Sequence, residues 1–325
     1  MPEMAAQGWQ GLEPATSPAD AALKYERDGL FCVDDVLTPE EVVLLRNGAH
    51  ERFTQVLKKY QIKKWFCEQT GQPLLTRHAE MAQRDGGRVD SRYGMDAAPF
   101  CTMLRRGGAA ARLIPLLCGV LGDDAEVVAQ GQVVAMSSDG WIRSLGEDGF
   151  GDQEWHTDGR NGDLPPAHAL TVFIPLCDVT LTNGPTQFIL GSHRTGESRG
   201  QDDVGATDEA RAARATTFHP RAGSAIAFDY RLWHRGLLNA GLVDRPVLYF
   251  IVGRPIWKDG CKGLPRLDIG TTSLFTGLEV DPMPPFRLNA RSTSTVTANG
   301  CDERTQESDC NPAPRRSNRY RKRPR

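Results

Sequence analysis

The chain has 325 residues, and its 39 basic and 41 acidic side chains give a formal charge of −2. This near-neutral balance excludes an argument from net charge for binding to nucleic acid or to a membrane surface. Hydrophobic residues make up 39% of the chain, enough for a packed core, and the 33 glycines and 21 prolines predict many turns, which favours strands and loops over a helical bundle.

Two helices are predicted near the start of the chain. The first begins at Asp20, the expected N-cap, and ends before Gly29. The second begins after Thr38, which with Glu41 forms a capping box, and apolar residues then recur at helical spacing for about 22 residues. A short strand is expected between them, at residues 30–33.

The next part of the chain carries weaker signals. Residues 61–108 show no clear periodicity, so we expect loops there and at most a short helix. Residues 109–121 predict a buried helix, which Gly122 ends.

From residue 127 onward the pattern changes to that of β-strands. Turn signals such as Asn183-Gly184-Pro185 separate several of the apolar segments. The expected strands are residues 127–136, 154–158, 169–176, 187–190, 224–228 and 246–252. Helices followed by strands indicate an α+β, mainly β fold, with the helices on one face of an antiparallel barrel or sandwich.

We expect one domain over residues 20–290, between a flexible N-terminus, residues 1–19, and a polar, disordered tail, residues 291–325. The last block, residues 315–325, holds seven of the basic residues and no acid. It is either a solvated end or a patch that contacts polyanions or an import receptor.

The sequence predicts an intracellular protein. Residues 1–20 lack the features of a secretory signal, and the longest apolar stretch, residues 169–177, is too short to span a membrane. The eight cysteines form no C-x-x-C pair and are spread over the chain, which indicates reduced thiols. The cytoplasm is the expected compartment, and the basic tail makes the nucleus the alternative.

A His-x-Asp pair, His156 and Asp158, lies within the strand expected at residues 154–158. Residues two apart on a strand point to the same face, so both side chains can bind one metal ion. The pair alone is also explained as a hydrogen-bonded pair on a strand surface. A second such pattern, at His78 and Glu80, lies where no strand is expected.

A second histidine, His234, lies 78 residues after His156, and a neighbouring strand can bring it to the same metal. Two imidazoles and one carboxylate on one face of an octahedral ion leave three positions for substrate and oxygen, which suits Fe(II). Arg245 directly precedes the apolar strand at residues 246–252, so its guanidinium needs a fixed anionic partner, such as the far carboxylate of a dicarboxylate co-substrate.

Together these residues resemble the phytanoyl-CoA dioxygenase family of Fe(II)/2-oxoglutarate-dependent oxygenases. Besides His156-x-Asp158, the resemblance rests on Tyr25-Glu26-Arg27-Asp28-Gly29-Leu30, Leu37-Thr38-Pro39-Glu40-Glu41, Asn183-Gly184-Pro185, Gly191-Ser192-His193, Arg231-Leu232-Trp233-His234, Asn239 and Arg245. It extends over residues 20–255. It implies a double-stranded β-helix (jelly-roll, cupin-like) core over residues 125–255, with N-terminal helices packed on one face.

The resemblance also implies roles for individual residues. His156, Asp158 and His234 would bind Fe(II) as the catalytic centre. Arg245 would bind the far carboxylate of 2-oxoglutarate, and Gln153 and Gln132 are candidates for further contacts with this co-substrate.

The implied activity is a dioxygenase reaction that consumes O2 and releases succinate and CO2, with ascorbate as a supporting reductant. Related halogenating enzymes lack a carboxylate at the position of Asp158, so its presence indicates hydroxylation, desaturation or epoxidation. The expected substrate is a small organic or lipid-like molecule, and the core is not expected to bind nucleic acid. Two alternatives stay open: a non-catalytic jelly-roll binding protein, and a metal enzyme of this fold that does not use 2-oxoglutarate.

Overall fold

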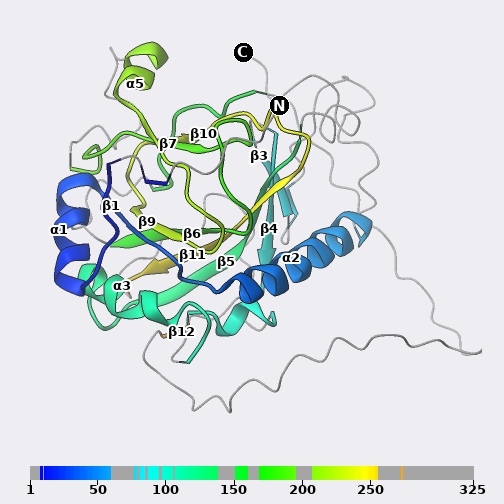
Figure 1. Cartoon of the computed structure of the whole chain (residues 1–325), viewed down its shortest axis with the longest axis horizontal. Coiled ribbons are helices and arrows are strands. Elements are labelled where there is room, and N and C mark those ends of the chain that lie inside the picture. The colour runs from blue at the N-terminus through cyan, green and yellow to red at the C-terminus, as the bar shows by residue number, and fades with distance from the viewer. Residues whose placement is uncertain are drawn as a thin grey trace, which may run out of the picture. The chain divides into compact units, whose positions relative to one another are not determined.

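The computed structural model describes residues 8–9, 11–59, 77–78, 81–84, 87–94, 97–104, 107–137, 151–159, 168–194, 207–254 and 272–273. The fold is mostly antiparallel sheet with few helices, so the expected α+β, mainly β class is confirmed (Figure 1). The predicted tail, residues 291–325, lies outside the described residues. So do residues 60–76, which include part of the segment in which loops are expected.

Nine of the described strands form one large sheet in which every pairing is antiparallel. Their order is β1 (Leu30–Val33), β9 (Ala225–Asp229), β6 (Ala169–Pro175), β11 (Arg245–Gly253), β5 (Glu126–Ala135), β4 (Arg88–Tyr93), β3 (Met81–Arg84) and β2 (Arg77–His78), with β12 (Thr272–Ser273) paired to β5. A smaller antiparallel sheet has the order β10 (His234–Gly236), β7 (Thr186–Phe188) and β8 (Thr216–Thr217).

The two faces of the large sheet have different neighbours. Along β11, Leu248, Phe250 and Val252 belong to the main core, which they share with the helices. The alternate residues Tyr249 and Ile251 line a pocket on the other face. This separation follows from the period of two along a strand, which sends successive side chains to opposite faces.

Helices pack on the first face and the smaller sheet packs on the second (Figure 1). The helical elements on the first face are α1 (Pro18–Asp28), α2 (Pro39–Lys59), α3 (Ile114–Leu121) and the 3-10 turns η1 (Phe100–Thr102) and η2 (Ala111–Leu113). A further helix, α5 (Asp208–Arg214), buries none of its residues and does not join this layer. The sheets meet where Phe188 of β7 packs edge-to-face on Phe228 of β9, with ring centroids 5.1 Å apart. This two-sheet arrangement is the jelly-roll core that the resemblance implies.

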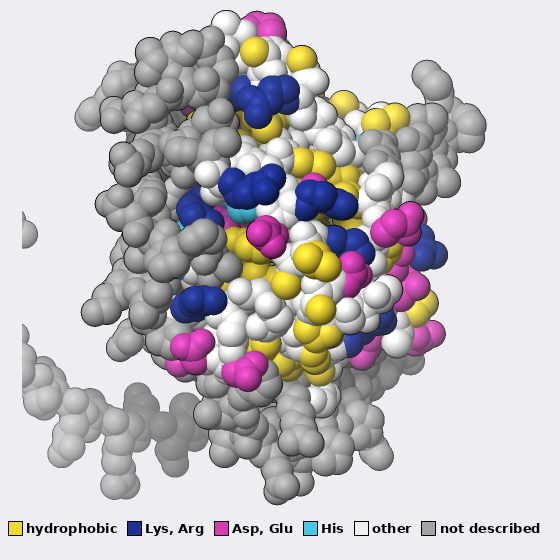
Figure 2. Space-filling model, turned by 90° about the vertical axis from the view of Figure 1, so that its left-hand side faces the viewer, with side chains coloured by type: hydrophobic (Ala, Val, Ile, Leu, Met, Phe, Trp, Pro, Cys, Tyr) yellow, Lys and Arg dark blue, Asp and Glu magenta, His cyan; other side chains and the backbone are white. Residues whose placement is uncertain are grey.

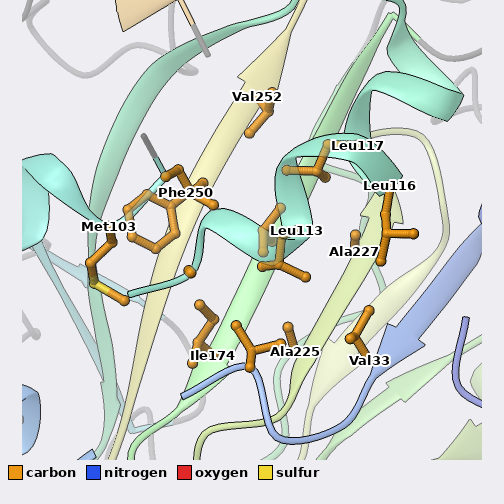
Figure 3. Close-up of a cluster of buried hydrophobic side chains, with 14 of the residues drawn as sticks. Val33, Met103, Leu113, Leu116, Leu117, Ile174, Ala225, Ala227, Phe250 and Val252 are labelled. Carbon is orange, nitrogen blue, oxygen red and sulfur yellow. The ribbon is translucent and has the colours of Figure 1, made fainter. Parts of the chain in front are cut away.

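The main core is an apolar layer between the helices and the large sheet. Figure 3 shows Leu113, Leu116 and Leu117 reaching from η2 and α3 toward Ala227 and Phe250 on the strands. Leu113 and Leu117 are fully buried. Burying a leucine side chain stabilises the fold by about 1.5–3 kcal/mol, so these contacts hold the helix layer on the sheet.

The caps of the two N-terminal helices differ in how well the sequence predicts them. The capping box of α2 is confirmed, because Thr38 N donates to Glu41 Oε2 at 2.8 Å and Glu41 N donates to Thr38 Oγ1 at 3.2 Å. The prediction that Asp20 caps α1 is wrong. Pro18 occupies the first turn, and Ser17 is the N-cap, whose hydroxyl accepts from the backbone of Asp20.

Three further expectations differ from the structure. Part of residues 61–108 forms β2, β3 and β4 rather than loops. Residues 154–158 form no ladder, only a single bridge between His156 and His234. Chain packing also begins earlier than residue 20, because Trp9 is buried against Phe218 and donates to Asp34 Oδ1 at 2.7 Å.

The face of the molecule in Figure 2 carries basic and acidic side chains next to one another, with hydrophobic ones between them. As far as its described residues go, this face has mixed charge. No helix of the described segments combines the length and the apolar character that a membrane span requires.

We expect Leu117→Ala to lower the free energy of unfolding by about 2–5 kcal/mol, because the cavity left between α3 and the sheet has no other side chain to fill it. The matched control is Leu23→Ala in α1, where the leucine is 67% exposed and the expected change is below about 0.5 kcal/mol. Urea denaturation of both variants measures the difference. Equal losses in the two variants would contradict this account of the core.

Candidate functional site

A backbone bridge holds two histidines side by side. His156 N donates to His234 O at 3.0 Å, and His234 N donates to His156 O at 2.9 Å. Directly opposed residues of an antiparallel pair send their side chains to the same face, and the two imidazole centroids lie 4.4 Å apart. The structure therefore brings together two residues that lie 78 positions apart in the sequence.

Both imidazoles are oriented in the same way. His156 Nδ1 lies 2.8 Å from the carbonyl oxygen of Glu154, and His234 Nδ1 lies 2.9 Å from that of Leu232. A carbonyl only accepts, so Nδ1 of each ring carries the hydrogen of this bond. This second contact fixes the tautomer and leaves the lone pair of Nε2 for a metal ion.

Asp158 completes the group. Its Oδ2 accepts from Thr171 Oγ1 at 3.1 Å and lies 3.8 Å from Nε2 of His234. The potential ligand atoms of His156, Asp158 and His234 all lie within 4.8 Å of one another. Metal bonds of about 2.0–2.2 Å place atoms that share one ion at most about 4.4 Å apart, so a small closing movement of these side chains is enough to bind one divalent cation.

The chemistry of this donor set favours Fe(II). Two imidazole nitrogens and one carboxylate oxygen form the facial set that leaves three positions of an octahedral ion open. Around His234 the surroundings are apolar, since Phe228 packs edge-to-face at 5.0 Å and Phe188 stacks at 6.0 Å between centroids. An apolar shell of this kind limits the access of water to the bound ion.

A pocket of about 200 Å³ opens between these three residues and the face of the large sheet that carries Tyr249 and Ile251, which we call the inner face. One water needs about 10–15 Å³ by the same measure, so the pocket has room for a small organic molecule. Its lining combines aliphatic and aromatic side chains with polar and charged ones, which is typical of a ligand site.

Arg245 lies at one end of this pocket, and Arg88 of β4 lies beside it. The cross-strand register places both arginines opposite Ala135 of β5, one on each side. Gly184 O accepts from Arg245 Nη2 at 2.7 Å and from Arg88 Nη2 at 3.3 Å, and Asn183 O accepts from Arg245 Nε at 2.9 Å. The turn at residues 183–184 therefore positions two cations next to each other.

The surroundings of both arginines lower their pKa values. Burial lowers the pKa of Arg245 to about 10. Burial, and then the charge of Arg245, lower the pKa of Arg88 to about 9. Both guanidinium groups remain protonated at neutral pH, and a carboxylate beside them offsets their mutual repulsion. This end of the pocket is suited to an anionic group.

The two glutamines expected near the co-substrate lie in different places. Gln153 lines the pocket, and its Oε1 accepts from the backbone N–H of Gly236 at 3.1 Å. Gln132 is fully buried on the opposite face of the sheet, where its Nε2 donates to Ala49 O of α2 at 2.7 Å. Its neighbour Val133 faces the pocket instead, so the expectation that Gln132 contacts the co-substrate is corrected.

Several pocket residues are not found by sequence reasoning. Arg88, Asp90 and Arg92 line the pocket from β4, within the segment expected to be loops. Their spacing of two is itself a strand signal, but charged residues on that face hide the usual apolar alternation. Thr171 and Tyr249 also line the pocket, from strands that were predicted for their hydrophobicity alone.

A family model described as Phytanoyl-CoA dioxygenase (PhyH) matches residues 25–247 of the chain. This range contains the three potential metal ligands, Gln153, Gln132 and Arg245. It spans more than half of the chain.

Solved structures show the same fold at low sequence identity. EctD from S. alaskensis in its apo form is 19% identical, with 86% of this chain and 94% of that chain covered and a TM-score of 0.54. The non-heme alpha ketoglutarate dependent epimerase SnoN from nogalamycin biosynthesis is 17% identical, with 82% and 92% covered and a TM-score of 0.52. AviO1 from Streptomyces viridochromogenes Tue57 is 21% identical, with 75% and 98% covered and a TM-score of 0.51.

The family match extends over the helices, the strands and the pocket described above. The shared fold and the donor set of the pocket agree with it. The chain belongs to the phytanoyl-CoA dioxygenase family of Fe(II)- and 2-oxoglutarate-dependent oxygenases.

Proposed function

We propose that the chain oxidises a small organic substrate with Fe(II) held by His156, Asp158 and His234 and with 2-oxoglutarate held by Arg245. The observation that carries this proposal is the convergence of three ligand atoms within 4.8 Å of one another, with each Nδ1 already bonded to a backbone carbonyl. Fe(II), 2-oxoglutarate and O2 together supply the oxidising power, by decarboxylation to succinate and CO2 coupled to oxidation of a substrate C–H bond.

The residues of the chain position the reactants. The backbone bridge sets the spacing of the two imidazoles, and the hydroxyl of Thr171 orients the carboxylate of Asp158 toward them. Asp158 would occupy one position of a bound metal, which favours oxygenation over halogenation. The side-chain carbonyl of Gln153 ties residues 151–159 to β10 beside His234, so the ligand-bearing segments move little relative to each other.

Arg245 is the proposed partner for the far carboxylate of 2-oxoglutarate. The residue is 5% exposed, and the two hydrogen bonds of its guanidinium to Asn183 O and Gly184 O hold it at the end of the pocket. Within the described residues, no carboxylate forms an ion pair with it. The fork of an arginine matches a carboxylate, and Arg88 beside it adds a second positive charge.

Production of succinate by the purified protein tests the proposal. Incubation with Fe(II), 2-oxoglutarate, ascorbate and O2 is expected to release succinate slowly without substrate and faster once a substrate is present. The rate is measured by mass spectrometry of succinate. A non-catalytic binding protein, or a metal enzyme that does not use 2-oxoglutarate, would release none above the level of Fe(II) without protein.

We expect His156→Ala to lower the affinity for Fe(II) by about 100-fold or more, because one of three protein ligands and its backbone-fixed orientation are lost. Anaerobic equilibrium dialysis against Fe(II) measures this change. The control is His50→Ala, since His50 is an exposed residue of α2 far from the bridge in the fold. Equal Fe(II) affinity in His156→Ala and the unmodified protein would remove His156 from the metal site.

We expect Arg245→Gln to weaken 2-oxoglutarate binding to the Fe(II) protein by about 10–150-fold, because charge-assisted hydrogen bonds contribute about 1.5–3 kcal/mol. Fe(II) affinity is expected to stay unchanged. Anaerobic calorimetric titration with 2-oxoglutarate measures the loss.

Arg245→Lys is the companion variant, which keeps the charge but not the fork, and its affinity is expected to be intermediate. An unchanged dissociation constant in Arg245→Gln would leave the metal site in place and reject the proposed co-substrate anchor.

A further inference from the structure

The inner face of β4 carries a second cation, Arg92, at a distance from the proposed co-substrate anchor. Arg88 and Arg92 are four residues apart on the same face, and four residues of strand span about 13 Å. Arg88 is level with Arg245, whereas Arg92 is level with Tyr249, with Gly131 between them. One molecule of 2-oxoglutarate bound at Arg245 therefore leaves Arg92 available for a different group.

Arg92 is buried but has no anionic partner among the described residues. Its side chain lines the pocket, the residue is 6% exposed, and its Nε makes no hydrogen bond. Arg231 provides a contrast within the same chain, because it is equally buried and bonds to Asp229 at 2.9 and 2.7 Å. Burying a charge without a partner is unfavourable, because the charge loses its hydration, so the position favours a ligand that brings a negative charge.

The acid nearest to Arg92 along β4 is oriented toward another residue. Asp90 Oδ1 accepts from the hydroxyl of Tyr249 at 2.9 Å. Gly131 makes this contact feasible, because a Cβ at this position would lie 2.8 Å from Tyr249 Oη and 2.4 Å from Ser91 O. The space that a side chain at Gly131 would need is taken by the hydroxyl of Tyr249, which lies against the β5 backbone there.

The pocket wall between the metal site and Arg92 is mainly apolar. Phe173, Tyr249 and Ile251 line it, and Phe173 lies opposite Tyr249 in the register of β6 and β11. The row of residues from Phe173 of β6 to Arg92 of β4 crosses three strand intervals, about 14 Å. Since Thr171 of β6 bonds to Asp158, the metal site is at the β6 end of this wall and Arg92 is at the β4 end.

The charge of the pocket is consistent with one further anion. Its described lining contains three arginines and two aspartates, a net charge of +1 when both histidines are neutral. A divalent metal and the dianion 2-oxoglutarate cancel each other. One positive charge remains. A monocarboxylate neutralises it, whereas a phosphate with two negative charges would leave the pocket with a net negative charge.

We propose that Arg92 binds a carboxylate of the substrate that the enzyme oxidises. We propose further that this substrate is a small monocarboxylic acid with an apolar body. The apolar body lies on Phe173 and Tyr249, with its far end at the metal site. This assignment rests on the proposed function for the identity of the reaction, but the carboxylate site itself depends only on Arg92 and its surroundings.

Two probe pairs test the site: benzoate with benzamide, and hexanoate with hexanamide. Each is titrated by anaerobic calorimetry into protein loaded with Fe(II) and saturating 2-oxoglutarate, and again into protein loaded with Fe(II) alone. At least one carboxylate is expected to bind about tenfold or more tightly than its amide, as a charge-assisted contact requires.

Variants assign the preference to a residue. In Arg92→Gln the carboxylate is expected to bind no better than the amide, a loss of about tenfold, and Arg92→Lys is expected to recover part of it. The dissociation constant of 2-oxoglutarate should stay within about twofold in both variants, because the two sites are separate. Arg221→Gln, which removes an exposed arginine that pairs with Asp35, controls for the change in net charge.

Footprinting of the unmodified protein gives an answer that does not depend on the folding of a variant. Phenylglyoxal should modify Arg92, and the carboxylate but not its amide should protect it, as read by mass spectrometry of peptides. Protection of Arg245 by 2-oxoglutarate is the internal control.

The outcomes separate the two proposals. Carboxylates that bind no better than their amides, or not at all, overturn the assignment, as does a preference that survives in Arg92→Gln. Failure of the Fe(II) protein to bind 2-oxoglutarate overturns the proposed function instead. In that case the titrations with Fe(II) alone still decide whether Arg92 binds a carboxylate.

Discussion

The site depends on one backbone pairing, the two hydrogen bonds between His156 and His234. They join the segment before β6 to the short strand β10, and they place two imidazoles side by side without any help from a metal. Because each ring is also tied to a carbonyl of its own segment, the orientation of both Nε2 atoms is set by backbone geometry. The protein thereby prepares the ligand geometry before an ion binds, which lowers the cost of ordering the site on binding.

In the large sheet, side chains that stabilise the fold and side chains that line the pocket lie on opposite faces, because successive residues of a strand point to opposite sides. Residues on one face join the core with α1, α2 and α3, while their neighbours in sequence line the pocket. Buried arginines on the pocket face contribute little to stability when no anion is near, since desolvation opposes them. We propose that they bind anionic ligands. The register assigns them two places: Arg245 with Arg88 at one end, and Arg92 about 13 Å along the strand at the other.

Much of the fold could be predicted because its signals are local. The capping box at Thr38 and the apolar strands β6 and β11 needed no tertiary information. The strand β4 was missed since its inward side chains face a polar pocket rather than a core. The direction of Gln132 could not be predicted either, because which face a strand residue occupies is decided by pairing with distant strands. The proposed metal ligands His156, Asp158 and His234 could be predicted only by combining the spacing of these residues with a family resemblance.

Anomalous diffraction at the iron edge, from crystals prepared anaerobically with Fe(II) and 2-oxoglutarate, is the most direct measurement of the central claim. The account predicts one iron position bonded to Nε2 of His156, Nε2 of His234 and a carboxylate oxygen of Asp158. It also predicts that the far carboxylate of 2-oxoglutarate contacts Arg245. Iron at any other place, or bonded through Nδ1 of either ring, would contradict the claim that the backbone bridge prepares this site.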